Sequence, residues 1–395
     1  MEDQFAIPMS SPDITDAERQ AVLSVLQTPN LSMGPQILAF EETFRDFSGR
    51  RQAIGVSSGT AGLHLCVRAA GIDPGDMVIT TPFSFVASSN VLLFENAIPI
   101  FVDVDPLTGN IASERVLEAA NDLANEGPAA WWWLPRRGAE SAQKLKAILP
   151  VDVFGQPADL ESIRATADRF SLKMIEDSCE ALGATYMDCK AGTVGDFGVY
   201  AFYPNKQMTT GEGGVVVTDD DQAADLMRAL RNQGRAPGDT WLQHTYLGYN
   251  YRLDELSAAL GAVQMRRLEE MLVKRERVAG WYGERLGGLT AVEIPAAAST
   301  TTRLSWFVYV IRFVPDIDRD EVARRLDDLG IPARPYFSPI HLQPYMVERF
   351  GYQPGDFPIT EDLGKRSLAI PFSSVMTEDQ VDRVCQSLTK VLESL

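Results

Sequence analysis

Short apolar runs alternate with helix-sized segments between residues 52 and 218, and this alternation limits the possible folds more than any other feature of the chain. The segments between the first five runs, such as "TAGLHLCVRAAG" and "ADLESIRATADRF", are typical of βαβ units with a parallel sheet buried on both faces. Only a short lysine-containing segment joins the last two runs, so we expect those strands to pair differently. The sequence predicts an α/β fold, a mostly parallel seven-stranded sheet between two helical layers. The predicted strands are 52–56, 77–81, 98–104, 148–153, 172–177, 197–203 and 213–219.

The chain beyond this sheet is expected to form a second, smaller unit. Residues 253–286 are predicted to form one long amphipathic helix that ends at Gly287 and Gly288. A strand and two helices follow, at 305–313, 319–330 and 377–395. We therefore divide the chain into a large domain with an N-terminal arm, residues 1–280, and a small α+β domain, residues 281–395.

Charge and cysteine content exclude several classes of function. Lys and Arg total 36 against 54 Asp and Glu, a formal charge of −18. Because such a chain repels phosphate backbones, we expect no nucleic-acid partner, and an anionic substrate must be held by a local cluster of donors. Four scattered cysteines and three dispersed histidines predict no metal site and favour a reducing, cytoplasmic compartment. We find neither a secretory leader nor the roughly 18 consecutive apolar residues of a membrane-spanning helix, and expect no membrane association.

The segment "VSSGTAGLHL", residues 56–65, is predicted to be a strand end, a polar turn and a helix start. The backbone N–H groups of Gly59, Thr60 and Ala61 would point out of the helix N-terminus, with the hydroxyls of Ser57 and Ser58 nearby. Such an arrangement binds anions. An ordinary N-cap turn is the alternative interpretation, because short Gly/Ser turns are common.

Two further residues follow predicted strands at the edge where open α/β sheets bind ligands. Asp177 ends the strand in "MIEDSCEALGA", where a helix N-cap is the alternative, and Lys206 lies in the loop "AFYPNKQMTTGEGG". A desolvated lysine at that edge can lose its proton and form a Schiff base with an aldehyde. An anion cup, an acid and a lysine together are what pyridoxal phosphate requires for its phosphate, ring nitrogen and aldehyde. Phe85, after the second strand, could stack on the ring, although an aromatic core residue needs no such explanation.

Seven motifs in one order resemble the DegT/StrS sugar aminotransferases, pyridoxal-phosphate enzymes of the aspartate aminotransferase fold, fold type I. The motifs are "SSGTAGLHL", "TPFSFVASSN", "PVDVFGQPADL", "IEDSCEALGA", "FYPNKQMTTGEGG", "GYNYRLDELSAALG" and "PYFSPIHLQPY", and they cover nearly the whole chain. The resemblance implies that Lys206 binds the cofactor aldehyde, that Asp177 pairs with the ring nitrogen and that Phe85 stacks on the ring. The further cofactor contacts that it implies are Thr60 and Ala61 at the phosphate and Glu180 near the ring hydroxyl.

Family dimers build each active site from two chains, so the resemblance also implies a homodimer with shared sites. Asn250 of the "GYNYR" motif would reach the phosphate in the partner subunit, with Arg252 beside it. The chain departs from the family pattern at Ala201, where many members carry a serine that helps to hold the phosphate. Loss of that donor should weaken cofactor binding by about 1–2 kcal/mol if nothing replaces it.

A second departure is a long insertion, residues 127–144, which contains three adjacent tryptophans in "WWWLPRR". Three adjacent side chains cannot all face one side of an element, so at least one should be exposed unless a second surface covers it. The insertion could fold over its own subunit. Alternatively, its indoles could cover the active-site mouth and stack on a nucleotide base, while Arg136 and Arg137 meet the diphosphate.

The predicted function is therefore the transamination of a nucleotide-linked keto-sugar to an amino sugar, with glutamate as the amino donor. The run "TTGEGG" after the lysine resembles the branch that acts on 4-keto-6-deoxy sugars rather than on 3-keto sugars. One alternative is a pyridoxamine-phosphate-dependent sugar dehydratase on the same fold. Its members carry histidine in place of the lysine, so Lys206 argues against it. The other is a cofactor-binding regulator without turnover, for which the sequence shows no helix-turn-helix extension and no basic patch.

Overall fold

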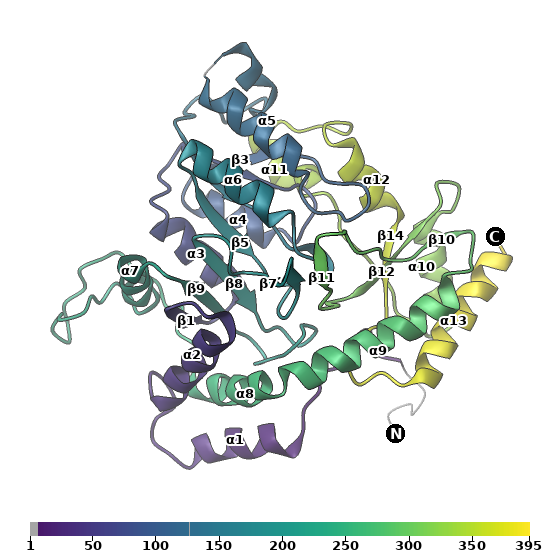
Figure 1. Ribbon diagram of the computed structural model, residues 1–395, viewed down its shortest axis with the longest axis horizontal. Coiled ribbons are helices and arrows are strands. Elements are labelled where there is room, and N and C mark those ends of the chain that lie inside the picture. Colours follow the sequence, from purple (N-terminus) through teal and green to yellow (C-terminus); the bar gives the residue numbers. More distant parts are fainter. Residues whose placement is uncertain (1–6, 126) are drawn as a thin grey trace.

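A seven-stranded sheet lies at the centre of the large unit in the computed structural model, which describes residues 7–125 and 127–395 (Figure 1). The strand order is β1-β9-β8-β5-β4-β2-β3. Only β9 runs antiparallel to its neighbours, β1 and β8, and the remaining pairs are parallel. The predicted sheet and the different pairing of its last two strands are thus confirmed. The strands are β1 (Gln52–Val56), β2 (Met77–Thr80), β3 (Ile98–Phe101), β4 (Leu145–Leu149), β5 (Lys173–Asp177), β8 (Phe197–Ala201) and β9 (Gly214–Thr218).

Two strands, β4 and β3, differ most from their predicted bounds. The structure places β4 at Leu145–Leu149, whereas the apolar run predicted 148–153. The strand ends where Pro150 follows, because proline has no N–H group to donate to a neighbouring strand. Strand β3 ends at Phe101 rather than at 104, and Val104 forms an isolated bridge with Ile111 instead.

Helices cover both faces of the sheet, as the near-continuous apolar strands require. Helices α3, α4 and α7 lie on one face, and α2, α5, α6 and α8 lie on the other. Alternate side chains of β9 separate the two layers: Val216 packs toward α3, whereas Val215 and Val217 pack toward α2 and α8. The helices of this unit are α1 (Asp16–Leu26), α2 (Pro35–Ser48), α3 (Gly59–Ala69), α4 (Ala87–Phe94), α5 (Ser113–Ala124), α6 (Leu160–Phe170), α7 (Asp221–Arg231) and α8 (Glu255–Arg266).

An antiparallel four-stranded sheet, in the order β10-β12-β14-β13, forms the core of the smaller unit. Helices α9, α10 and α13 contribute the apolar side chains that pack with it. This is the compact α+β tail that the sequence predicts. Its elements are α9 (Leu268–Leu286), β10 (Val292–Glu293), β12 (Tyr309–Phe313), α10 (Arg319–Asp328), β13 (Arg334–Pro335), α11 (Pro344–Phe350), α12 (Pro358–Arg366), β14 (Ser367–Ile370) and α13 (Glu378–Glu393). A small sheet of β11 (Thr301–Arg303), β6 (Thr185–Tyr186) and β7 (Cys189–Lys190) lies between the two units.

The prediction of a single long helix over residues 253–286 is wrong. The helix is interrupted at Arg267 (φ −101°, ψ 3°), between α8 and α9. The Arg267 guanidinium forms ion pairs with Asp13 at 2.8 Å and Glu18 at 2.6 Å, so the break is tied to the N-terminal arm. Helix α9 then runs from the large unit to the small one (Figure 1). It passes residue 280 without interruption, and the domain boundary placed there stays a prediction.

The tryptophan-containing insertion packs partly on its own chain. Trp133 is half-buried and donates its indole N–H to Asp122 at 2.9 Å, whereas Trp131 and Trp132 are 76% and 90% exposed. The predicted exposure of at least one indole is confirmed. Arg136 is already paired with Asp356 at 2.5 Å. A diphosphate would therefore have to compete with that carboxylate for the Arg136 guanidinium.

Candidate active site

A cavity of about 440 Å³ opens where β5 and β8 end and where α3 begins. It collects most of the predicted site residues: Gly59, Thr60, Phe85, Asp177, Glu180 and Lys206. Ala61 and Asn250 are not among the residues that line it, and no residue of the insertion is, within the described part of the chain. The prediction that the insertion covers the active-site mouth therefore finds no support in the structure of one subunit.

The N-terminus of α3 combines both interpretations of the Ser/Gly turn. Ser58 is the N-cap, and its hydroxyl accepts the Ala61 N–H at 3.1 Å. The Ala61 N–H is thus engaged within the chain, and its part in phosphate binding stays a prediction. The N–H groups of Gly59 and Thr60 also lie in the first turn, where a helix provides no acceptor, so they can bind an anion. A Cβ on Gly214 would lie 2.9 Å from the Gly59 nitrogen, so β9 approaches this turn as closely as it does only because residue 214 is glycine.

Asp177 lies at the end of β5, is 6% exposed and faces the cavity. Its Oδ1 accepts the Cys179 N–H at 3.2 Å, but no helix begins here, so the N-cap interpretation is wrong. Burial raises the pKa of the Asp177 carboxyl, and the charge of Lys206 acts against that rise. No lysine or arginine of the described residues lies within ion-pair distance of Asp177. A buried carboxylate of this kind favours a cationic ligand.

Lys206 extends into the same cavity, and its side chain is 13% exposed. Its Nζ lies 3.7 Å from Glu180 Oε1 and 3.8 Å from the ring centroid of Phe307. Burial raises the pKa of the Glu180 carboxyl, and Lys206 acts against that rise. The second Glu180 oxygen accepts the Phe154 N–H at 3.0 Å, which fixes the carboxylate beside the amine.

Arg275 binds the backbone of the segment that contains Lys206, a role that the sequence did not reveal. It is 2% exposed and donates to the Lys206 carbonyl at 2.6 Å and to the Trp306 and Phe307 carbonyls at 3.0 and 3.2 Å. Burial lowers its pKa to about 10. Its neighbours in the run "KRER" (274–277) are charged, so the sequence suggests only a solvated helix face.

The smaller unit supplies a wall of aromatic rings that the sequence also did not predict. Phe307, Tyr336 and Phe337 line the cavity opposite the sheet. The motif "PYFSPIHLQPY" contains the last two, but nothing in its pattern indicates which rings face a ligand. Phe85 is 63% exposed at the cavity, so its interpretation as a core residue is wrong.

The segment with Asn250 is fixed by a network of rings and charges on α3 and α4. Tyr249 and Tyr251 stack with their ring centroids 4.9 Å apart. The Tyr251 hydroxyl lies 3.0 Å from His64 Nδ1, and the Tyr249 hydroxyl donates to Glu95 at 3.1 Å. Asn250, between the two tyrosines, is exposed and does not line the cavity.

The three-layer α/β/α scaffold brings together an acid at a strand end, Asp177, a buried lysine, Lys206, and the N-terminus of α3. This combination defines a fold-type I pyridoxal-phosphate aminotransferase. The chain belongs to the DegT/DnrJ/EryC1/StrS aminotransferase family, whose sequence profile matches residues 12–389. It is 37% identical to the GDP-perosamine synthase of Caulobacter vibrioides over 99% of this chain and 100% of that protein. It is 31% identical to the GDP-perosamine synthase of Escherichia coli O157:H7, over 97% and 98% of the two chains.

The fold is also that of a solved aminotransferase. Helicobacter pylori PseC, described as an aminotransferase involved in the biosynthesis of pseudoaminic acid, superposes with a TM-score of 0.87. The two chains are 26% identical, and the match covers 99% of this chain and 100% of PseC. The residues around the cavity fit the cofactor, because the first N–H groups of α3, the buried Asp177 and the Lys206 amine face one space of about 440 Å³.

Proposed function

We propose that this enzyme transfers an amino group from glutamate to the keto carbon of a nucleotide-linked sugar, a 4-keto-6-deoxy sugar carried by GDP. The observation that supports this best is the convergence of Asp177, Lys206 and the N-terminus of α3 on one cavity. The names of two relatives, both GDP-perosamine synthases, favour GDP as the nucleotide. The "TTGEGG" run favours the 4-keto position.

Each residue of the cavity has a part in this proposal. When bound, pyridoxal phosphate supplies an aldehyde that takes up amines and a ring that accepts electrons from the adjacent carbon. The N–H groups of Gly59 and Thr60 hold its phosphate, and the exposed ring of Phe85 stacks on it. Asp177 keeps a proton on the ring nitrogen, since that cation compensates the cost of burying the carboxylate.

Lys206 binds the aldehyde between turnovers and moves the proton during them. Its Nζ takes a proton from the α-carbon of glutamate, and in the second half of the cycle it delivers a proton to carbon 4 of the sugar. Glu180, 3.7 Å away, orients the amine and lies near the ring hydroxyl. The hydrogen bond from Arg275 to the Lys206 carbonyl keeps the backbone of Lys206 in place.

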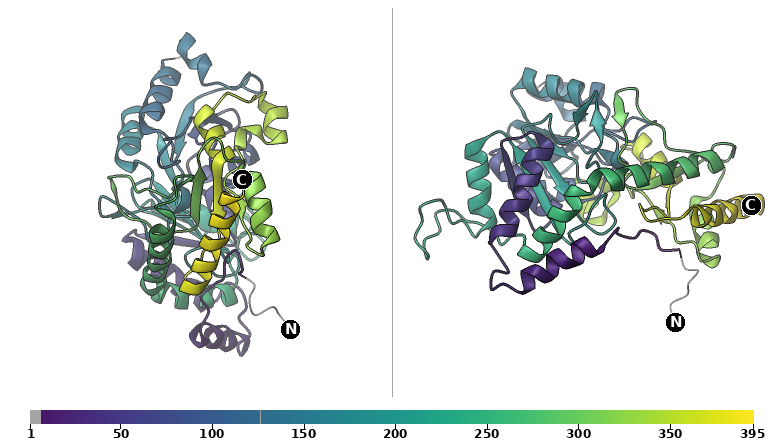
Figure 2. Two further views of the ribbon diagram at one scale, coloured as in Figure 1. Left: turned by 90° about the vertical axis from the view of Figure 1, so that its right-hand side faces the viewer. Right: turned by 60° about the horizontal axis from the view of Figure 1, so that its bottom comes forward.

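We further propose a homodimer in which Asn250 completes the phosphate site of the partner subunit. The loop after α7 projects from the body of the molecule in both figures (Figures 1 and 2). It exposes Trp241, Leu242 and Leu247 at 76%, 83% and 84%. Apolar side chains at this exposure are expected where a second chain covers them. We place the reaction in the cytoplasm, in keeping with four unpaired cysteines. No helix of the described residues has the length and apolar character needed to cross a bilayer.

A panel of keto-sugar nucleotides tests the proposal. The holoenzyme is supplied with glutamate and 4-keto-6-deoxy sugars linked to GDP, UDP or dTDP, and 2-oxoglutarate release is followed together with NMR of the sugar product. We expect nitrogen on carbon 4 and the highest kcat/KM for the GDP sugar. Lys206→Ala is the inactive control, and Lys190→Ala, a surface lysine, should leave turnover unchanged. Nitrogen on carbon 3, a deoxygenated product without nitrogen, or no turnover of any sugar would contradict the proposal.

A further inference from the structure

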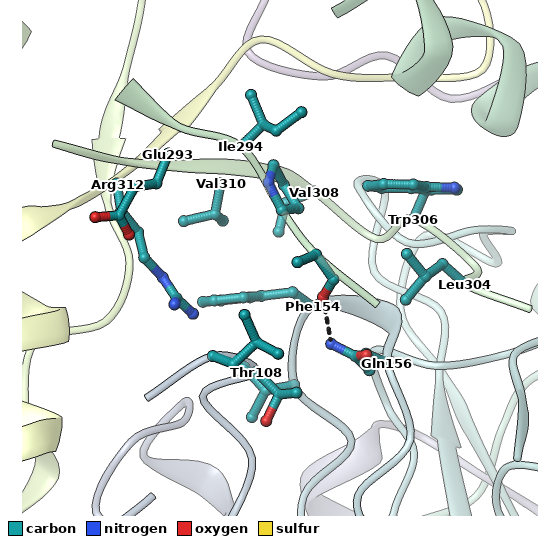
Figure 3. A pocket seen from close by; sticks show the side chains of 14 residues that line it. Thr108, Phe154, Gln156, Glu293, Ile294, Leu304, Trp306, Val308, Val310 and Arg312 are labelled. Carbon is teal, nitrogen blue, oxygen red and sulfur yellow. Dashed lines mark hydrogen bonds between the residues drawn. The ribbon is translucent and has the colours of Figure 1, made fainter. Parts of the chain in front are cut away.

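A second cavity, of about 220 Å³, lies between the two units (Figure 3). None of the residues that line it also lines the candidate active site. Strand β12 and the residues just before it form one wall, and residues 153–156 of the large unit form another. The walls are mainly apolar, with Phe154, Trp306, Val308 and Val310 among the side chains drawn in Figure 3. An apolar cavity of about 150 Å³ is large enough to hold benzene, so this one has room for a ring and a polar group.

The two cavities lie on opposite sides of one partition. Phe307 lines the candidate active site, whereas Trp306 and Val308, its neighbours in the chain, line the second cavity. Trp306 has a positive φ of 52° and Phe307 lies in a bend, so the chain turns here and places neighbouring side chains on different cavities. Phe154 completes the partition: it lines the second cavity and stacks on Phe337 of the first, with ring centroids 5.2 Å apart. A ligand in the second cavity would therefore not enter the first.

Arg312 gives the second cavity its charge. In Figure 3 its guanidinium reaches into the cavity toward Phe154. It donates one hydrogen bond, to the Pro106 carbonyl at 2.6 Å, and no carboxylate of the described residues lies within ion-pair distance of it. Glu293 at the rim is paired with Arg366 instead, at 3.5 Å. Burial lowers the pKa of Arg312, and the nearby carboxylates of Glu293, Asp105 and Asp362, none of them within ion-pair distance, act against that fall.

The remaining polar groups of the cavity are already engaged within the chain. Gln156 accepts the Ala298 N–H at 2.6 Å and donates to the Ala296 carbonyl at 3.3 Å. The Thr108 hydroxyl donates to Asp105 at 2.9 Å. The guanidinium, with five N–H donors, is therefore the group with donors to spare.

We propose that this second cavity is a binding site for a small organic carboxylate with an apolar ring or chain. The carboxylate pairs with the free N–H groups of Arg312, and the apolar part lies between Phe154, Val308 and Trp306. Charge complementarity favours an anion over a neutral molecule of the same shape. The site is independent of amino-group transfer, and nothing in the catalytic cavity contributes to it.

Isothermal titration of the holoenzyme with benzoate tests this proposal, with benzamide as the neutral molecule of matched shape. We expect benzoate to bind and Arg312→Gln to weaken that binding by about tenfold or more, the usual effect of losing a charge-assisted hydrogen bond. Arg324→Gln, an exposed arginine on α10, is the matched control and should leave benzoate binding unchanged. Lys206→Ala should also leave it unchanged, because benzoate does not occupy the catalytic cavity.

A second variant keeps the test decisive if Arg312→Gln fails to fold, since Arg312 also holds the Pro106 carbonyl. Ile294, 36% exposed at the rim, can be replaced by tryptophan to fill the cavity while Arg312 stays in place. Ile294→Trp should abolish benzoate binding. The proposal is overturned if the wild-type protein does not bind millimolar benzoate or binds benzamide equally well. It is also overturned if benzoate binding survives in both variants or is lost in Lys206→Ala.

Discussion

At the scale of single residues, the catalytic cavity is unusual in its balance of charge. Asp177 and Glu180 are both buried, burial raises the pKa of both carboxyls, and Lys206 is the cation near them. Two carboxylates around one amine leave a place for a second positive charge. The protonated ring nitrogen of the proposed cofactor would supply that charge at Asp177. The arrangement explains why Asp177 has no arginine or lysine partner among the described residues.

Substitution of Asp177 by asparagine should lower kcat by several orders of magnitude with little loss of stability. Asparagine keeps the shape and the hydrogen bond from Cys179 but cannot hold the ring nitrogen protonated, so the ring becomes a weak electron acceptor. The measurements are single-turnover kinetics with glutamate and the thermal unfolding midpoint. Normal kinetics combined with a strongly lowered midpoint would instead make Asp177 a structural residue.

Substitution of Arg275 by methionine should disturb the position of Lys206, although Arg275 does not line the cavity. The change leaves the carbonyls of Lys206 and Phe307 without their donor in a buried place, at a cost of about 1–3 kcal/mol for each unsatisfied group. We expect a lower unfolding midpoint and weaker cofactor binding, measured by equilibrium dialysis. Arg277→Met, an exposed neighbour on the same helix, is the control. Equal effects of the two variants would show that the hydrogen bonds from Arg275 do not support the Lys206 segment.

At the scale of elements, the sequence predicts what depends on local pattern and misses what depends on distant contacts. The strands of the central sheet follow from apolar runs. Strand β4 ends early because Pro150 interrupts its run, and it begins at Leu145, before the run. The break at Arg267 could not be predicted, since residues 253–286 are helix-forming throughout and the break comes with ion pairs to Asp13 and Glu18. The role of Arg275 also depends on distant contacts, so the sequence did not predict it. The position of Asp177 and Lys206 at the cavity was predicted, because strand ends mark the ligand edge of a sheet.

The contact between the N-terminal arm and α8 should weaken in acid. Burial raises the pKa of Glu18, but hydrogen bonds from Thr15, Arg267 and Gln264 outweigh that effect and lower it to about 2. A carboxyl with a lowered folded-state pKa stabilises the fold above its unfolded pKa, so this contribution is lost as the pH falls from about 5 to about 2. It amounts to roughly 2–3 kcal/mol. Glu18→Gln should be less stable than wild type at pH 7, with the gap in unfolding free energy closing toward pH 3. A gap that is constant with pH would contradict this linkage.

At the scale of the whole molecule, several side chains that the motifs or the insertion single out lie exposed on the surface of the described residues. Asn250 is exposed beside the stacked Tyr249 and Tyr251 and does not line the cavity of its own chain. Trp131 and Trp132 are exposed as well. The motifs predict that Asn250 contacts the cofactor. They do not predict whether it does so in its own chain or in a second copy, since the two copies have the same sequence.

Mixed dimers test whether Asn250 serves the partner. Lys206→Ala and Asn250→Asp should each be inactive alone, the first without its amine and the second because it places a carboxylate against the phosphate. In a mixed dimer with shared sites, both defects fall in one site, and the other has an intact lysine and an intact asparagine. If half of the dimers re-form as mixed pairs, about a quarter of all sites become active, so the mixture should recover about a quarter of wild-type activity. The control is each variant dissociated and re-formed alone. An inactive mixture, with mixed dimers demonstrated by two affinity tags, would mean that Asn250 acts within its own chain, and an active monomer would exclude the shared site altogether.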